Sequence, residues 1–144
     1  MRKVWIITAN RCKAKVFRAE NTHKLVEIKT VEHKEAHEHA RDLNADRQGR
    51  NNNRLGYGVD TMEAKTSVEE KDAVQFAMEL AHMLHEGYKA GFFERLYLIA
   101  NPPFVSILRD ALPKQVASLV EKEVHKDLTH SKGEEVREYL PPVL

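Results

Sequence analysis

Hydrophobic positions near the start of the chain follow the two-residue period of β-strands. Residues 4–9 are almost continuously apolar and rich in β-branched side chains, which is typical of a strand covered on both faces. Residues 13–19 and 25–31 alternate between apolar and polar side chains, and Asn10-Arg11 and Asn21-Thr22 supply turn residues between the segments. The pattern predicts three short strands joined as a meander.

The second half of the chain changes to a helical period. Ser67-Val-Glu-Glu70 has the sequence of a capping box and predicts the start of a long helix. Gly87 and Gly91 mark its end. The apolar residues of this helix form one stripe of Ala73, Phe76, Ala77, Leu80, Ala81, Leu84 and Tyr88.

Residues 96–100 are again continuously apolar and predict an interior strand, followed by a short helix with Asn101 as N-cap and Pro102 at its first position. Residues 113–128 fit a helix by the spacing of their apolar residues, whereas 119–128 also alternate as an edge strand would, and periodicity does not decide between the two. Ser131-Lys-Gly-Glu134 predicts a capping box for a last short helix. This order of elements predicts a single-domain α/β sandwich, with helices packed on one mixed sheet.

A polar segment separates the two patterned regions. From about 34 to 66 no apolar period is sustained, yet compact domains rarely contain structureless loops longer than about 15 residues without a function. Between Arg47 and Val59 there are three arginines and no acid, and such a cluster of cations suits phosphate. A solvated, disordered surface loop is the alternative interpretation. The segment contains half of the six glycines, namely Gly49, Gly56 and Gly58.

Composition narrows the class of protein. The 144 residues suit one domain, and a net charge of +1 excludes attraction of nucleic acid by an overall field. The single cysteine excludes an internal disulfide and fits a reducing compartment. The apolar run at residues 4–7 is too short for a signal peptide, and no window approaches the roughly 18 apolar residues of a membrane span. We therefore expect a cytoplasmic protein without membrane insertion.

The histidines are the candidate metal ligands. On a helix His33 and His37 would share a face at the spacing that zinc sites use, but His39 would point elsewhere and a third ligand would be missing. His82 and His85 are interpreted as residues of the solvent-facing side of the long helix. The sequence therefore predicts neither a metal nor another cofactor, with His33 and His37 as the residues to check.

Two further features bear on enzymatic activity. Asp42, Asp46 and Asp60 lie in the polar segment rather than on strands, and the chain has no nucleophile elbow, nucleotide-binding loop or Rossmann fingerprint. The turn at Asn101 could place a helix N-terminus near an anion, but two prolines remove backbone donors there, so we interpret it as a rigid turn. Arg109, further along this helix, adds a cation that could still contact phosphate.

Several of these segments together resemble the bacterial host attachment protein family, whose members are described as required for attachment to host cells. That family in turn is similar to the middle domain of archaeal and eukaryotic class-1 translation release factors. The resemblance implies a mixed five-stranded sheet with helices on both faces, and a strand near residues 119–127. The segments that carry it are residues 4–17 (VWIITANRCKAKVF), 42–50 (DLNADRQGR), 76–77, 98–104 (LIANPPF) with Leu108-Arg109, and 126–129 (KDLT).

In release factors the loop that precedes the long helix carries a Gly-Gly-Gln tripeptide that promotes hydrolysis of peptidyl-tRNA. The corresponding segment here has Gln48-Gly49 but no Gly-Gly-Gln, so hydrolysis is not expected and Gln48 is the sole catalytic candidate. The loop's cations could still bind ribosomal or other structured RNA through phosphates. The predicted phosphate-contacting residues are Arg41, Arg47, Gln48, Gly49, Arg50, Arg54 and Arg109.

The leading hypothesis is therefore a cytoplasmic, non-catalytic module that binds RNA or the ribosome. One alternative is a regulatory module whose loop orders on a protein partner and so affects attachment. Another is an enzyme, acting either on peptidyl-tRNA through Gln48 or with a metal held by the histidines. The sequence indicates no particular oligomeric state.

Overall fold

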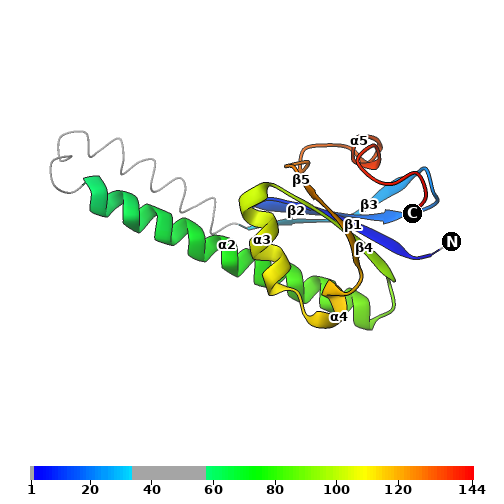
Figure 1. Cartoon of the computed structure of the whole chain (residues 1–144), viewed down its shortest axis with the longest axis horizontal. Helices are drawn as coiled ribbons and strands as arrows, with labels where there is room; N and C mark the ends of the chain where they lie inside the picture. Colours follow the sequence, from blue (N-terminus) through cyan, green and yellow to red (C-terminus); the bar gives the residue numbers. More distant parts are fainter. Residues whose placement is uncertain (1, 34–57) are drawn as a thin grey trace.

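The computed structural model describes residues 2–33 and 58–144, and the side chains of the second range from residue 70 onward. Three strands are followed by a long helix, a strand, two shorter helices, a strand and a final short helix (Figure 1). The elements are β1 (Val4–Ala9), β2 (Lys13–Ala19), β3 (Leu25–Glu32), α2 (Gly58–Lys89), β4 (Arg95–Ala100), α3 (Pro102–Ala111), α4 (Lys114–Ala117), β5 (Val120–His125) and α5 (Gly133–Arg137).

The strands form one mixed sheet in the order β3-β2-β1-β4-β5. The first three pair antiparallel as the predicted meander, whereas β4 runs parallel to β1 and β5 runs parallel to β4. The pairing of β2 with β3 shifts register between Val16 and Phe17, because Ile28 is an extra residue on β3. The predicted α/β fold with a mixed five-stranded sheet is thus confirmed.

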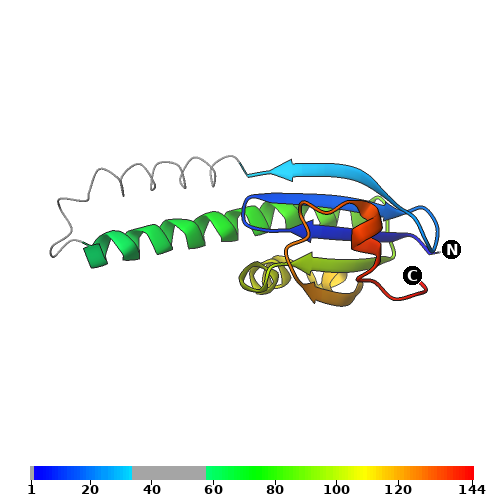
Figure 2. The same cartoon turned by 90° about the horizontal axis from the view of Figure 1, so that it is seen from above.

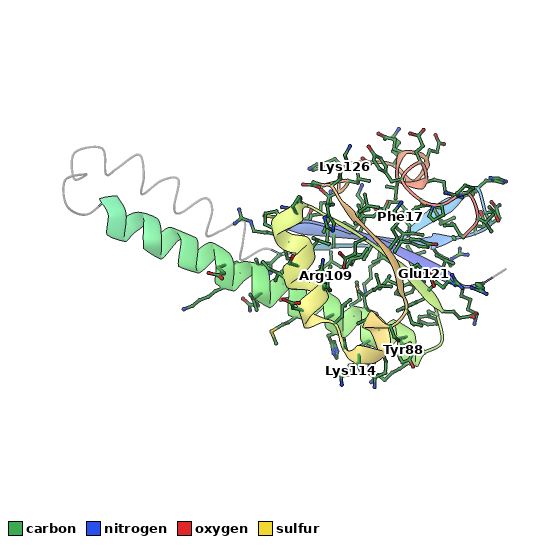
Figure 3. All side chains as sticks on the ribbon, in the orientation of Figure 1. Phe17, Tyr88, Arg109, Lys114, Glu121 and Lys126 are labelled. Carbon is green, nitrogen blue, oxygen red and sulfur yellow. The ribbon has the colours of Figure 1, made fainter. Side chains whose placement is uncertain are left out.

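Helices cover both faces of this sheet, as the resemblance implied (Figures 1 and 2). Alternate residues of β1 divide between two cores: Trp5 and Ile7 pack toward α2, α3 and α4, and Val4 and Ile6 pack on the opposite side. Phe17 belongs to this second core, which the short helix α5 closes (Figure 3). Within the residues that the structure describes, no helix combines the length and apolarity needed to cross a membrane.

The long helix confirms one prediction and corrects another. Its predicted stripe is buried from Ala73 to Leu84, and Tyr88 is partly buried against the same core. The predicted start is wrong, because α2 already begins at Gly58 and the sequence Ser67–Glu70 lies within it. Residues 58–66 therefore belong to the helix and not to the expected loop. They have no apolar period to reveal them, although Met, Glu, Ala and Lys among them favour helix. The first turns of α2 project beyond the sheet (Figure 1).

The smaller elements settle the remaining predictions. The ambiguous stretch contains both a four-residue helix, α4, and a strand, β5, which confirms the strand implied near 119–127. Pro102 is the first residue of α3 as predicted, but the side chain of Asn101 makes no capping hydrogen bond. The last helix begins one residue later than expected, since the Glu135 carboxylate accepts a hydrogen bond from the Lys132 amide at 3.2 Å.

Candidate functional site

Most of the predicted phosphate-contacting residues lie between β3 and α2, outside the residues that the structure describes. This group consists of Arg41, Arg47, Gln48, Gly49, Arg50 and Arg54, together with the metal candidate His37. Their roles stay predictions. Two predicted residues, Arg109 and His33, are described by the structure.

Arg109 lies on α3 (Figure 3), and its guanidinium is held by Glu123 of β5. Its Nε and Nη2 atoms donate to the two oxygens of the Glu123 carboxylate, each at 2.5 Å. His125 Nε2 lies 3.2 Å from one of the same oxygens. The hydrogen bonds from Arg109 lower the pKa of Glu123, and those to Glu123 raise the pKa of Arg109. A phosphate at this position would have to compete with Glu123 for the guanidinium.

His33 is buried just after β3, where its ring stacks on Phe76 of α2 with centroids 5.1 Å apart. Its Nδ1 atom lies 3.9 Å from the carboxylate of Glu79. His82 is exposed as predicted, whereas His85 is partly buried and stacks on Tyr88. Across residues 2–33 and 70–144, no three His, Cys, Asp or Glu side chains are grouped as they would be around a metal ion.

A polar cluster lies where the parallel strands β1 and β5 end. Asn10 Nδ2 donates to Asp127 Oδ2 at 3.0 Å and to Thr129 Oγ1 at 3.1 Å. Thr129 donates to Asp127 through both its hydroxyl and its amide. Asn10 Oδ1 also accepts the amides of Cys12 and Lys13, which makes the predicted turn between β1 and β2. Because these polar groups hydrogen-bond to one another, we interpret the cluster as a structural link between the ends of β1 and β5.

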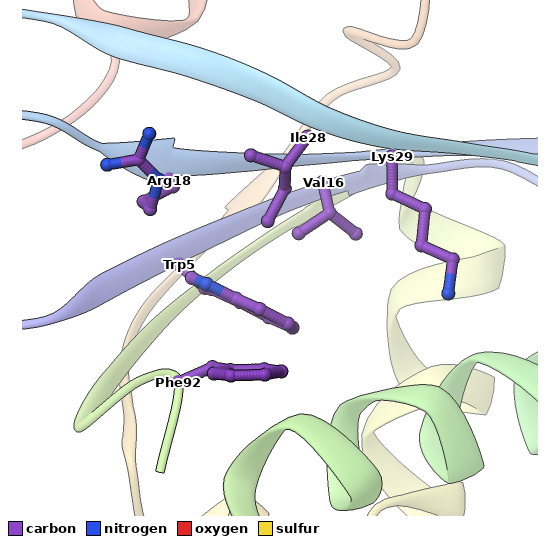
Figure 4. A pocket seen from close by; sticks show the side chains of 6 residues that line it. All are labelled: Trp5, Val16, Arg18, Ile28, Lys29 and Phe92. Atoms are coloured by element: carbon purple, nitrogen blue, oxygen red, sulfur yellow. The ribbon is translucent and has the colours of Figure 1, made fainter. Parts of the chain in front are cut away.

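A pocket of about 330 Å³ that no sequence pattern had indicated lies on the α2 side of the sheet. Figure 4 shows Trp5 lying over Phe92, with Arg18 and Lys29 on either side of the two rings. The ring centroids of Trp5 and Phe92 are 6.2 Å apart, and Trp5 also stacks on Phe93 at 4.8 Å. The pocket is lined by Trp5, Val16, Arg18, Ile28, Lys29 and Phe92.

Local sequence explains how these side chains come together. Trp5 and Arg18 face each other across β1 and β2, and Val16 faces Lys29 across β2 and β3. The bulge at Ile28 lets two consecutive residues of β3 line the same pocket. Phe92 comes from the turn after α2. The two adjacent phenylalanines that follow Gly91, Phe92 and Phe93, were the available sequence signal for this pocket. The pattern of the strand that contains Trp5 does not show which loop will contact it.

Comparisons with known proteins give a family match from one source and a fold match from another. Residues 5–140 match the model of a family described as "protein required for attachment to host cells". The crystal structure of the archaeal translation termination factor aRF1 is similar with a TM-score of 0.52 and 10% sequence identity. The match covers 97% of this chain and 35% of that protein, so the chain spans about a third of its length. At this identity the likeness shows a shared fold. No curated protein sequence matches.

Proposed function

The chain belongs to the family of proteins required for attachment to host cells, and we propose that it serves there as a non-catalytic, cytoplasmic RNA- or ribosome-binding module. The observation that carries the proposal is the fold: almost the whole chain superposes on part of a translation termination factor. In this proposal the effect on attachment is indirect and acts through RNA or translation.

The proposed contact is the arginine-bearing segment between β3 and α2. Arg47, Arg50 and Arg54 lie in a stretch without acids, and guanidinium groups bind phosphate oxygens in bidentate fashion. Phosphate contacts supply affinity that does not depend on base sequence. Because the chain contains no Gly-Gly-Gln, the proposal is binding of RNA and not hydrolysis of peptidyl-tRNA.

The test is binding of a fluorescently labelled RNA hairpin, followed by anisotropy over a range of salt concentrations. Arg47→Ala with Arg50→Ala is expected to weaken binding and to reduce the salt slope by about two, since two phosphate contacts are lost. The matched control is Lys114→Ala with Lys122→Ala, which removes the same charge from exposed positions on α4 and β5. Absence of binding by the wild type, or an equal loss in the control, would contradict the proposal.

A protein-interaction module is the second candidate, favoured by one observation on α2. Val74 and Met78, one helical turn apart, are 43% and 62% exposed. Residues at this spacing are neighbours on a helix surface, so the two side chains offer a partner a small apolar patch. Purification of the tagged protein from cells discriminates the two, because this candidate predicts recovery of a stoichiometric protein without RNA.

A further inference from the structure

We propose that the Trp5–Phe92 pocket binds one base of single-stranded RNA, with the base stacked on Phe92 and the neighbouring phosphates on Arg18 and Lys29. This inference rests on the proposed RNA-binding function and assigns it a contact on the folded part of the chain.

On the aromatic side of the pocket, the ring of Phe92 is exposed to solvent. Phe92 is 58% exposed, whereas Trp5, on which it stacks, is only 8% exposed. The position of Phe92 is fixed by its amide, which donates to the Gly87 carbonyl at 2.9 Å, and by the positive φ of 76° at Gly91. A rigid, exposed aromatic ring is the feature on which proteins stack bases of single-stranded nucleic acid.

On the cationic side of the pocket, Arg18 and Lys29 provide two positive charges that favour an anionic ligand. Neither Arg18 nor Lys29 makes a side-chain hydrogen bond or ion pair with any residue that the structure describes, and no carboxylate lines the pocket. Glu27, the nearest acid along β3, accepts a hydrogen bond from the Thr30 hydroxyl at 2.8 Å and is not among the lining residues. Two cations beside an apolar floor complement a ligand with a flat ring and a negative backbone.

The alternative ligand for this region is an extended peptide that pairs with the outer edge of β3. The geometry of β3 disfavours such pairing. The bulge at Ile28 interrupts the regular ladder of β3 next to the pocket, and bulges at sheet edges hinder the pairing of a further strand. The pocket volume is also at the lower end of the range for small-molecule sites, which suits a single base. A nucleotide therefore fits these features better than a strand.

The experiment uses the emission of Trp5, the only tryptophan of the chain. A short oligouridylate is titrated into the full-length protein while Trp5 fluorescence and the anisotropy of the labelled RNA are both recorded. The wild type is expected to show quenching that saturates together with the anisotropy. Phe92→Leu is expected to bind at least about fivefold more weakly, the lower range of base–aromatic stacking energies. Arg18→Ala with Lys29→Ala is expected to weaken binding and lower the salt slope.

Two controls keep the outcome interpretable. Val143→Ala removes an apolar side chain that is more exposed than Phe92, and it should change neither signal. Circular dichroism of Phe92→Leu should match the wild type, because its side chain is mostly outside the core.

The possible outcomes distinguish failure of the pocket assignment from failure of the proposed RNA-binding function. If the RNA binds by anisotropy but Trp5 emission stays constant and Phe92→Leu binds like the wild type, the pocket assignment is wrong while the proposed function stands. If no RNA binds under any condition, both are overturned. A change of Trp5 emission with an acidic, phenylalanine-containing peptide but not with RNA would assign the pocket to a protein and overturn the inference.

Discussion

Gly87 lies so close to Trp5 that a Cβ at this position would be 2.8 Å from both Cη2 and Cζ3 of the indole. Helix α2 can therefore approach β1 only because residue 87 has no side chain. The sequence suggested that Gly87 marks the end of the helix, but α2 runs to Lys89 and Gly87 lies within its last turn. Its main role is to allow this contact with Trp5. The indole that contacts Gly87 is the same ring that stacks on Phe92 in the pocket.

Gly87→Ala is expected to destabilise the protein by about 1–3 kcal/mol, the usual cost of overpacking a core. Because the added methyl group displaces the indole, the emission of Trp5 should shift in the folded protein. Urea unfolding monitored by circular dichroism measures the first effect, and the native emission spectrum measures the second.

Gly91→Ala provides the matched comparison. Gly91 has a positive φ of 76°, and apart from Gly91 and its two chain neighbours no atom of the described residues lies within 4 Å of the place that a Cβ would occupy there. Alanine at this position therefore costs backbone strain, about 1 kcal/mol, without displacing Trp5. An unshifted emission in Gly87→Ala, or an equal shift in both variants, would show that the close approach is not what fixes the indole.

Burial on α2 predicts opposite results for two neighbouring residues. Leu80 is fully buried, so Leu80→Ala should lower the free energy of unfolding by about 2–5 kcal/mol. Met78 is largely exposed, so Met78→Ala should change it by no more than about 0.5 kcal/mol. Denaturant unfolding of both variants measures the difference, and a large cost for Met78→Ala would mean that another surface covers this face.

The ion pair of Arg109 with Glu123 leads to a prediction about RNA affinity. Since Glu123 occupies the guanidinium, Glu123→Gln should strengthen RNA binding and steepen its salt slope by about one, as Arg109 becomes available to phosphate. Adding Arg109→Ala to this variant should remove the gain. The three proteins are compared by anisotropy, and an unchanged affinity in Glu123→Gln would remove Arg109 from the proposed contacts.

Asp127 predicts a pH dependence. Burial raises its pKa, but hydrogen bonds from Thr129 and Asn10 outweigh this, so the pKa of Asp127 lies below its ordinary value. A lowered pKa in the folded state stabilises the fold above about pH 4, and this contribution is lost as the pH falls through the folded value.

Asp127→Asn should therefore be less stable than the wild type near neutral pH, by about 1 kcal/mol for the weakened hydrogen bonds of a solvent-exposed side chain. The difference should shrink on acidification, because the wild type then loses the same carboxylate. Urea midpoints at about pH 7 and about pH 3 test it. A gap that is the same at both pH values would mean that the Asp127 charge contributes nothing.

Local patterns in the sequence predicted the meander, the body of the long helix and the interior strand that follows it, whereas the fifth strand was implied by the family resemblance. The meander and the buried stripe of α2 follow from periods of two and of 3.6 residues, which are local properties. The start of α2 was missed because residues 58–66 are helical without an apolar face. The strand β5 was ambiguous because its valines alternate with charges at a sheet edge, where a short segment fits both periods.

The site features depend on pairings that no local pattern contains. Trp5 reads as an ordinary core residue of a buried strand, and Phe92 reads as part of a loop. Their contact requires β4 to return beside β1, which brings the turn after α2 back to the sheet. The Arg109–Glu123 pair likewise requires α3 and β5 to be neighbours, although the two residues are 14 positions apart.

Binding of RNA by this protein is tested most directly by ultraviolet crosslinking in cells that produce it, followed by sequencing of the RNA and mass spectrometry of the crosslinked peptides. We predict enrichment of ribosomal or other structured RNA over an untagged control, with crosslinks in peptides that contain Arg47 or Phe92. RNA recovery at the level of the untagged control would contradict the account.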